Sequence, residues 1–166
     1  MKGQVGLVTG RGFIPAAVRT GTRGDFSHVI VHAGDGMVAS AQLGGTVLRP
    51  AEEYPDAVWS HFVMAAWQAE AVADFARSHV GAPYNLASAA LVVLSRALTL
   101  HLPPDRQFRF YQCAQLAEDA LTYAGVLIYP HGREPGPASP YTLQREFEAR
   151  GWYTSTRTKP AQPRLR

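Results

Sequence analysis

The sequence predicts an α+β protein in which a small antiparallel sheet comes first and helices follow. Up to residue 64, short apolar runs bounded by glycine and segments that alternate with a period of two are typical of strands. From residue 65 onward, apolar residues recur at helical spacing. A run of strands followed by a run of helices indicates the α+β class.

The predicted strands are, in order, "GQVGLVTG", "FSHVIVHAG", "MVASAQ", "GGTVLRP" and "AVWSHFVM". In the second of them, His28, Ile30 and His32 alternate with valines, as expected of a strand with two different faces. The "GDG" at 34–36 is a hairpin signal that joins this strand to the next. Between the first two strands, residues 12–22 predict a short helix.

The predicted helices cover residues 65–81, 86–100, 113–125 and 139–151. Glycine follows the apolar pattern at Gly81 and Gly125, where it is a common C-terminal stop. Ser139 and Pro140 form a good start for the last helix, because serine caps the first turn and proline fits its first position.

Length and composition indicate one globular domain over 1–152 and a basic flexible tail over 153–166. The net charge of +3 owes much to this tail, which carries no acidic residue. We expect a solvated tail and no nucleic-acid partner, with a basic binding patch as the alternative. No secretory signal and no apolar run long enough to span a bilayer are found, so we expect synthesis in the cytoplasm, with export by another system left open. The oligomeric state is left open.

Cys113 is the single cysteine of the chain, which excludes an internal disulfide framework. It stands at the predicted start of the helix over 113–125, where unpaired backbone N–H groups and the helix dipole stabilise a thiolate and an oxyanion. Two interpretations follow. Cys113 is either a reactive nucleophile or a small buried apolar residue, which is the common role of free cysteines.

His28 is the candidate partner for that thiol, because a strand histidine that faces a helix start can pair with a thiolate there. The alternative is a structural histidine, and we assign that role to the other five. No compact spacing of Cys, His and acidic residues indicates a zinc site, so we expect no metal.

Two segments resemble the conserved blocks of NlpC-type papain-like cysteine peptidases. Residues 26–50 resemble the histidine block, and "YQCAQLAEDALTYAGV" resembles the nucleophile block. Here the histidine precedes the cysteine, which is the order of the circularly permuted branch that includes the YiiX-like proteins and relatives of lecithin–retinol acyltransferase. The opening of the chain, "VGAPYN" and "SPYTLQRE" also resemble that branch, and the resemblance covers roughly residues 3–147.

The resemblance implies a permuted papain-like fold, a small sheet or half-barrel packed against helices with the nucleophile at a helix N-terminus. It implies Cys113 as nucleophile and His28 as general base and acid, with no cofactor. A third group orients the imidazole in such sites, and its position corresponds to Ser40, with Gln42 as a substitute. Tyr84 and Tyr111 are candidate substrate contacts, with core packing as the alternative for Tyr84.

The resemblance also implies the reaction, the cleavage of an amide or isopeptide bond in a peptide or peptidoglycan-type substrate. Acyl transfer or hydrolysis of a lipid ester on the same fold is an alternative, and a catalytically weak binding or structural module is another. The module is favoured by Ser40, where relatives carry Glu, His, Asn or Gln, because a serine hydroxyl is short and uncharged. Further departures are Ala114 for a common serine, Asn85 for a common aspartate and Gly3-Gln4 for "GD".

Overall fold

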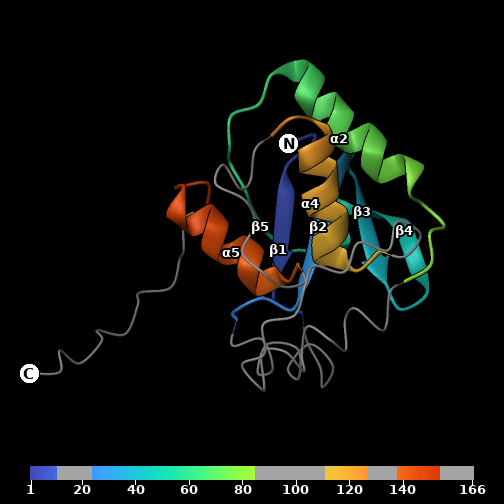
Figure 1. Cartoon of the computed structure of the whole chain (residues 1–166). Coiled ribbons are helices and arrows are strands. Elements are labelled where there is room, and N and C mark those ends of the chain that lie inside the picture. The colour runs from blue at the N-terminus through green and yellow to red at the C-terminus, as the bar shows by residue number, and fades with distance from the viewer. Residues whose placement is uncertain (11–23, 85–110, 127–137, 154–166) are drawn as a thin grey trace, which may run out of the picture.

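The computed structural model describes residues 1–10, 24–84, 111–126 and 138–153. These residues form an antiparallel five-stranded sheet in the order β4-β3-β2-β1-β5, with helices packed against it (Figure 1). The predicted α+β class is therefore confirmed. The predicted helices over 12–22 and 86–100 lie outside the described residues, as does the tail from 154 onward.

The strands are β1 (Val5–Val8), β2 (His28–Gly34), β3 (Met37–Gln42), β4 (Gly45–Pro50) and β5 (Val58–Trp59). Four of them match the prediction closely, whereas β5 is far shorter than the segment 57–64 predicted for it. The reason lies on β1, where the N–H of Val5 donates to the side-chain oxygen of Ser60 at 2.9 Å. The Ser60 hydroxyl takes the place of the backbone carbonyl that a continuing strand would offer to the N–H of Val5. Accordingly, β5 ends at Trp59 and does not continue to residue 64.

The hairpin between β2 and β3 forms at the predicted "GDG". Gly34, Asp35 and Gly36 have φ angles of 97°, 51° and 70°. Two consecutive positive φ values are what a tight hairpin needs, and glycine and aspartate adopt them at low cost. The local sequence thus sets which strands become neighbours.

The helical elements are the 3₁₀ turn η1 (Ala51–Glu53) and the helices α2 (Ala66–Ser78), α4 (Cys113–Tyr123) and α5 (Pro140–Ala149). Ser139 caps α5 as predicted, since its hydroxyl accepts the N–H of Thr142 at 3.1 Å. Among the helices that the structure describes, none has both the length and the apolar character of a membrane-spanning segment.

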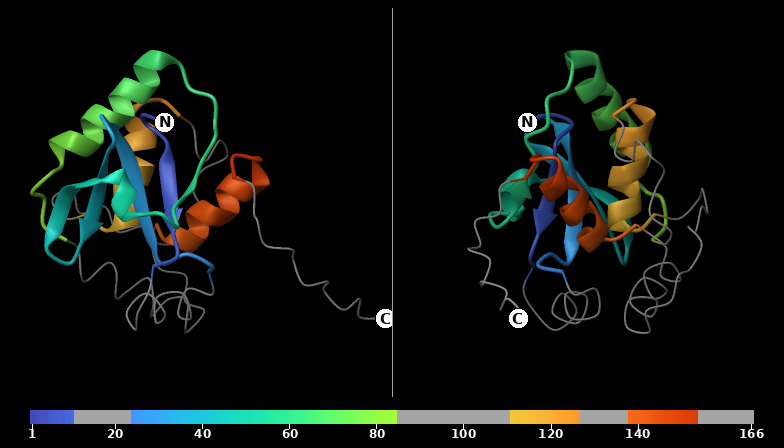
Figure 2. Two further views of the ribbon diagram at one scale, coloured as in Figure 1. Left: turned by 180° about the vertical axis from the view of Figure 1, so that it is seen from behind. Right: turned by 60° about the vertical axis from the view of Figure 1, so that its left-hand side comes forward.

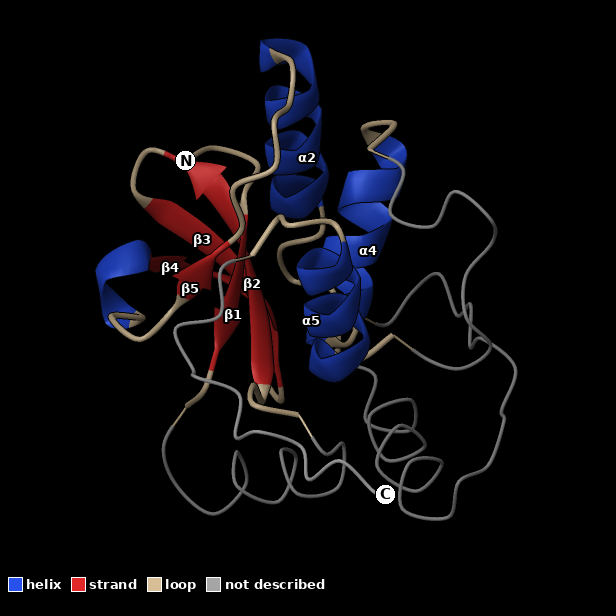
Figure 3. Cartoon of the chain, turned by 90° about the vertical axis from the view of Figure 1, so that its left-hand side faces the viewer, coloured by secondary structure: helices blue, strands red, loops and turns tan. Residues whose placement is uncertain are grey.

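Each face of the sheet buries its own apolar cluster. Val29 and Val31 of β2 face the helices and join the larger core with residues of α2, α4 and α5. Figures 2 and 3 show these three helices on one side of the sheet. Ile30, between the two valines, faces the other side and packs with Val8, Val38 and the segment around η1. The period-two pattern of β2 therefore separates the two faces, as the sequence predicts.

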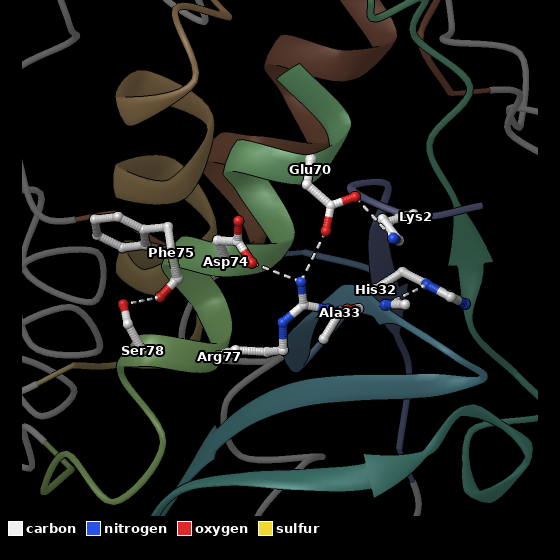
Figure 4. Close-up of polar contacts among 9 residues, drawn as sticks. Lys2, His32, Ala33, Glu70, Asp74, Phe75, Arg77 and Ser78 are labelled. Carbon is white, nitrogen blue, oxygen red and sulfur yellow. Dashed lines mark hydrogen bonds and ion pairs between the residues drawn. The ribbon is translucent and has the colours of Figure 1, made fainter. Parts of the chain in front are cut away.

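Helix α2 is fixed to the sheet by a cluster of charged side chains at one end of β2 (Figure 4). Arg77 pairs with Glu70 at 3.0 Å and with Asp74 at 2.6 Å, and it also donates to the carbonyl of Ala33. Glu70 in turn meets the ammonium of Lys2 at 2.8 Å. Because these groups are largely solvated, we assign them to positioning α2, with a small contribution to stability.

Candidate functional site

Cys113 is the first residue of α4 and its side chain is buried, with 5% of its surface exposed. The preceding residue, Gln112, has an extended backbone and its amide donates to the carbonyl of Ala138. This bond joins the start of α4 to the segment that leads into α5. The helix start predicted from the sequence is therefore present, and the bond from Gln112 holds it to the segment before α5.

Three backbone N–H groups interact electrostatically with the Cys113 thiol, those of Val29, Ala114 and Cys113 itself. Each lowers the pKa of the thiol, as expected at a helix N-terminus. Burial has the larger effect, because it removes water from the charged form, and the pKa of the thiol is raised to about 11. The sequence leaves a reactive thiolate and a small buried apolar residue as alternatives. The packing of the sheet against α4 buries the sulfur, so the thiol is neutral in the resting site.

His28, the first residue of β2, contacts Ser40 of the neighbouring strand. Its Nε2 atom lies 2.8 Å from the Ser40 hydroxyl oxygen. Burial lowers the pKa of the ring to about 4. Since the thiol of Cys113 titrates near pH 11, both groups are uncharged at pH 7.

The sulfur of Cys113 and the ring of His28 lie on opposite faces of the sheet. His28 is the cross-strand partner of Val8, which belongs to the cluster on the face away from the helices. Cys113 packs with Val29 on the helix face. Within the part of the chain that the structure describes, no hydrogen bond joins the sulfur to the ring.

The matched pairs of β2 and β3 begin at Val31 and Ala39. The N–H of His32 donates to the carbonyl of Gln4, just before β1, so by alternation the N–H of Val29 points toward β3. Beside it, the imidazole of His28 contacts Ser40. Because the N–H of Val29 also lowers the pKa of the Cys113 thiol, the start of α4 lies near this part of β2.

The other predicted site residues are Tyr84, Tyr111 and Gln42. Tyr84 forms an isolated bridge with Tyr111, and the proximity of Cys113 adds to burial in raising the pKa of the Tyr84 phenol. The hydroxyl of Tyr111 is instead paired with Nε2 of His79 at 3.1 Å. Gln42 makes no side-chain hydrogen bond with any described residue. Tyr84 is thus the tyrosine whose phenol interacts electrostatically with Cys113.

Tyr54 also belongs to the site, although the sequence analysis did not predict it. Its hydroxyl donates to the Ser40 oxygen at 3.1 Å, and its ring is stacked on that of His28, with centroids 6.4 Å apart. It follows η1, a turn whose position over the sheet depends on packing against Ile30 and Val38. No spacing or motif in the sequence connects Tyr54 with His28.

The described residues contain no group of three or more His, Cys, Asp or Glu side chains that could hold a metal ion.

Comparison with known proteins finds no matching family model and no matching curated protein. Among solved structures, the chain is similar to the crystal structure of metalloprotein yiiX from Escherichia coli O157:H7. The TM-score is 0.49 and the sequence identity is 16%, over 87% of this chain and 91% of that chain. A similarity of this degree carries no argument about chemistry, so the function is argued from the site.

Proposed function

We propose that the protein is a cysteine hydrolase with Cys113 as nucleophile and His28 as general base and acid. One observation carries the proposal: Cys113, the first residue of α4, lies in one buried cluster with Val29, the residue that follows His28. The backbone N–H of Val29 also lowers the pKa of the thiol. A cysteine at a helix start, a histidine on the strand that faces the helix and a hydroxyl bonded to that histidine are the groups that acyl transfer uses. Ser40 supplies the hydroxyl.

The proposed reaction starts from a neutral thiol and a neutral imidazole. It requires the ring of His28 to come within reach of the sulfur, because the two side chains rest on opposite faces of the sheet. His28 accepts the thiol proton as the sulfur attacks the carbonyl carbon of the substrate, and a tetrahedral oxyanion forms. His28 then gives this proton to the leaving amine or alcohol, and a thioester on Cys113 remains. Water attacks the thioester with His28 as base, which releases the carboxylic acid and restores the thiol.

The backbone donors around the sulfur favour this route. The N–H groups of Val29 and Ala114 stabilise negative charge on the sulfur, and the desolvated site strengthens that interaction. We propose a peptide, isopeptide or peptidoglycan-type amide as the substrate, in line with the sequence resemblance. If an amine or alcohol replaces water in the last step, the same residues carry out acyl transfer.

A small activated ester tests the proposal, because the single cysteine makes every thioester assignable. Incubation with p-nitrophenyl acetate should give a burst of p-nitrophenolate and an acetyl adduct on Cys113, detected by intact-mass spectrometry. Cys113→Ala should abolish the adduct. His28→Gln should slow its formation by about 100-fold or more, since general-base catalysis contributes that much. His61→Gln, an exposed histidine, serves as the matched control and should leave the rate unchanged.

The result that contradicts the proposal is acylation that is equally slow in the native protein and in His28→Gln. Both would then react like an ordinary buried thiol, faster only when the protein is unfolded in urea. Far-UV circular dichroism of each variant separates such a result from a loss of fold.

A second candidate is a binding or structural module that keeps this architecture without turnover. The uncharged resting pair and the opposite faces of Cys113 and His28 favour it. This candidate predicts no thioester at any pH, and retained binding of the natural ligand by Cys113→Ala.

A further inference from the structure

Three side chains on the sheet face away from α4 form a chain of hydrogen bonds. The hydroxyl of Tyr54 donates to Ser40 Oγ at 3.1 Å, and Ser40 Oγ lies 2.8 Å from Nε2 of His28. Ser40 has no exposed surface. Its hydroxyl therefore has to satisfy its hydrogen-bonding capacity within the protein.

Counting donors and acceptors decides the direction of this chain. A serine hydroxyl has one hydrogen to donate. Among the described residues, Ser40 Oγ contacts Tyr54 and His28, and Tyr54 is the donor in the first contact. A buried hydroxyl hydrogen without an acceptor is destabilising. The hydrogen of Ser40 must then go to Nε2 of His28, which makes Nε2 an acceptor and leaves the hydrogen of the neutral ring on Nδ1.

We infer that Tyr54 and Ser40 hold resting His28 in the tautomer with its hydrogen on Nδ1. His28 then accepts a proton only after the hydrogen bonds from Tyr54 through Ser40 reverse their direction. In the resting tautomer, Nε2 is occupied by Ser40 and Nδ1 has no lone pair to offer. The ring cannot take a thiol proton in that state. The consequence for catalysis rests on the proposed function, whereas the tautomer itself does not.

Tyr54 is the positioning residue that permits the reversal. An imidazolium ring donates from both nitrogens, so its Nε2–H must donate to Ser40 Oγ. The Ser40 hydrogen then needs another acceptor, and the Tyr54 oxygen is the one in contact with it. Tyr54 is partly exposed, so its own hydrogen can turn toward water. The hydroxyl groups of Ser40 and Tyr54 together orient the His28 ring. A single charged or amide side chain more commonly has this role.

The low basicity of the ring agrees with this arrangement. Burial lowers the pKa of His28 to about 4, and no charged side chain of the described residues shifts it further. The groups that meet the ring are uncharged, Ser40 from β3 and Tyr54 after η1. The neutral ring is therefore the resting form over the physiological pH range, and its tautomer decides whether it can act as a base.

The test is NMR spectroscopy of the protein labelled with ¹⁵N-histidine, with His28 assigned by the signals lost in His28→Gln. At neutral pH the native protein should show a protonated Nδ1 and a hydrogen-bonded, unprotonated Nε2. Ser40→Ala should lose this preference because nothing then donates to Nε2. A native ring with its hydrogen on Nε2 overturns the tautomer assignment, and the tautomer itself is read from the native protein.

Tyr54→Phe tests the reversal. It should keep the resting tautomer, move the titration midpoint of His28 downward by about one pH unit, and slow acylation of Cys113 about tenfold or more, as expected for the loss of one hydrogen bond to a charged form. Tyr123→Phe, which removes an exposed tyrosine hydroxyl, is the control and should change neither quantity. An unchanged titration together with an unchanged acylation rate in Tyr54→Phe overturns the role of Tyr54.

The two proposals fail in different experiments. If the native ring carries its hydrogen on Nδ1 but no thioester forms, the tautomer assignment stands and the hydrolase proposal falls. If a thioester forms and the native ring carries its hydrogen on Nε2, the hydrolase proposal stands and the gating by Ser40 and Tyr54 falls.

Discussion

Cys113 and Val29 lie in one buried cluster, and the backbone N–H of Val29 lowers the pKa of the thiol, so the start of α4 and the strand β2 meet at the candidate site. This packing brings the sulfur close to the residue that follows His28. It also explains why the thiol is both supported by backbone donors and poorly ionised, because a sulfur that reaches a buried strand has left the solvent.

Alkaline titration should reveal the buried thiol. The pKa of Cys113 is raised from 9.0 to about 11, so the unfolded chain releases this proton first and stability is lost as the pH rises from 9 toward 11. The linkage relation gives a loss of about 1.4 kcal/mol at pH 10. Urea unfolding at pH 8 and pH 10 checks it. The loss should be smaller in Cys113→Ala, and an identical loss in both proteins would argue against a buried thiol.

Acid should destabilise the protein through His28. The pKa of the ring is lowered from 6.5 to about 4, so the unfolded chain binds this proton first and stability falls as the pH drops from 6.5 to 4. We expect a loss of about 2 kcal/mol between pH 7 and pH 5, absent in His28→Gln. Urea unfolding at both pH values measures it. His61→Gln, at an exposed site, should behave like the native protein.

The cap of α5 should contribute measurably to stability. Ser139 is fully buried and its hydroxyl accepts the N–H of Thr142, whose own hydroxyl accepts the N–H of Ser139 at 2.9 Å. Ser139→Ala removes the first of these bonds and should lower the free energy of unfolding by about 1–2 kcal/mol. Ser78→Ala, an exposed serine in the last turn of α2, should stay within about 0.5 kcal/mol of the native protein. Equal effects would mean that the cap is not formed.

Two glycines with similar backbones should respond very differently to alanine. Gly3 and Gly36 have φ angles of 77° and 70°, so alanine is strained at both. At Gly3 the added Cβ would also lie 2.8 Å from the Cα of Ala69 on α2, whereas at Gly36 it meets nothing within 4 Å. Gly36→Ala should cost about 1–2 kcal/mol, and Gly3→Ala about 1–3 kcal/mol more. Thermal unfolding of the pair checks the difference, and equal costs would exclude the close approach of α2.

Much of the fold could be predicted because its determinants are local. The alternation around Ile30, the "GDG" turn and the Ser139-Pro140 start each act within a few residues, and the structure confirms the corresponding strand, hairpin and helix. The length of β5 could not be predicted, because the side chain of Ser60 takes the N–H of Val5 from a distant strand.

The residues of the candidate site also differ in whether the sequence could predict them. The sequence identified Cys113 at a helix start and His28 on a strand, and it placed Ser40 where a partner of the imidazole is expected. It could not include Tyr54, which reaches Ser40 only because η1 packs over the sheet. It also left open whether the thiol is acidic, since a helix dipole can be inferred from sequence whereas desolvation depends on what covers the sulfur.

The sequence by itself determined the order of the elements, the two faces of β2 and the identity of the one thiol in the chain. Only the tertiary structure decided that the sulfur meets the N–H of Val29, that the ring of His28 is bonded to Ser40, and that both groups are uncharged at rest. The physical reason is the separation along the chain over which each interaction acts. Backbone preferences act between neighbours in the chain, whereas burial and hydrogen-bond partners depend on residues that folding brings together.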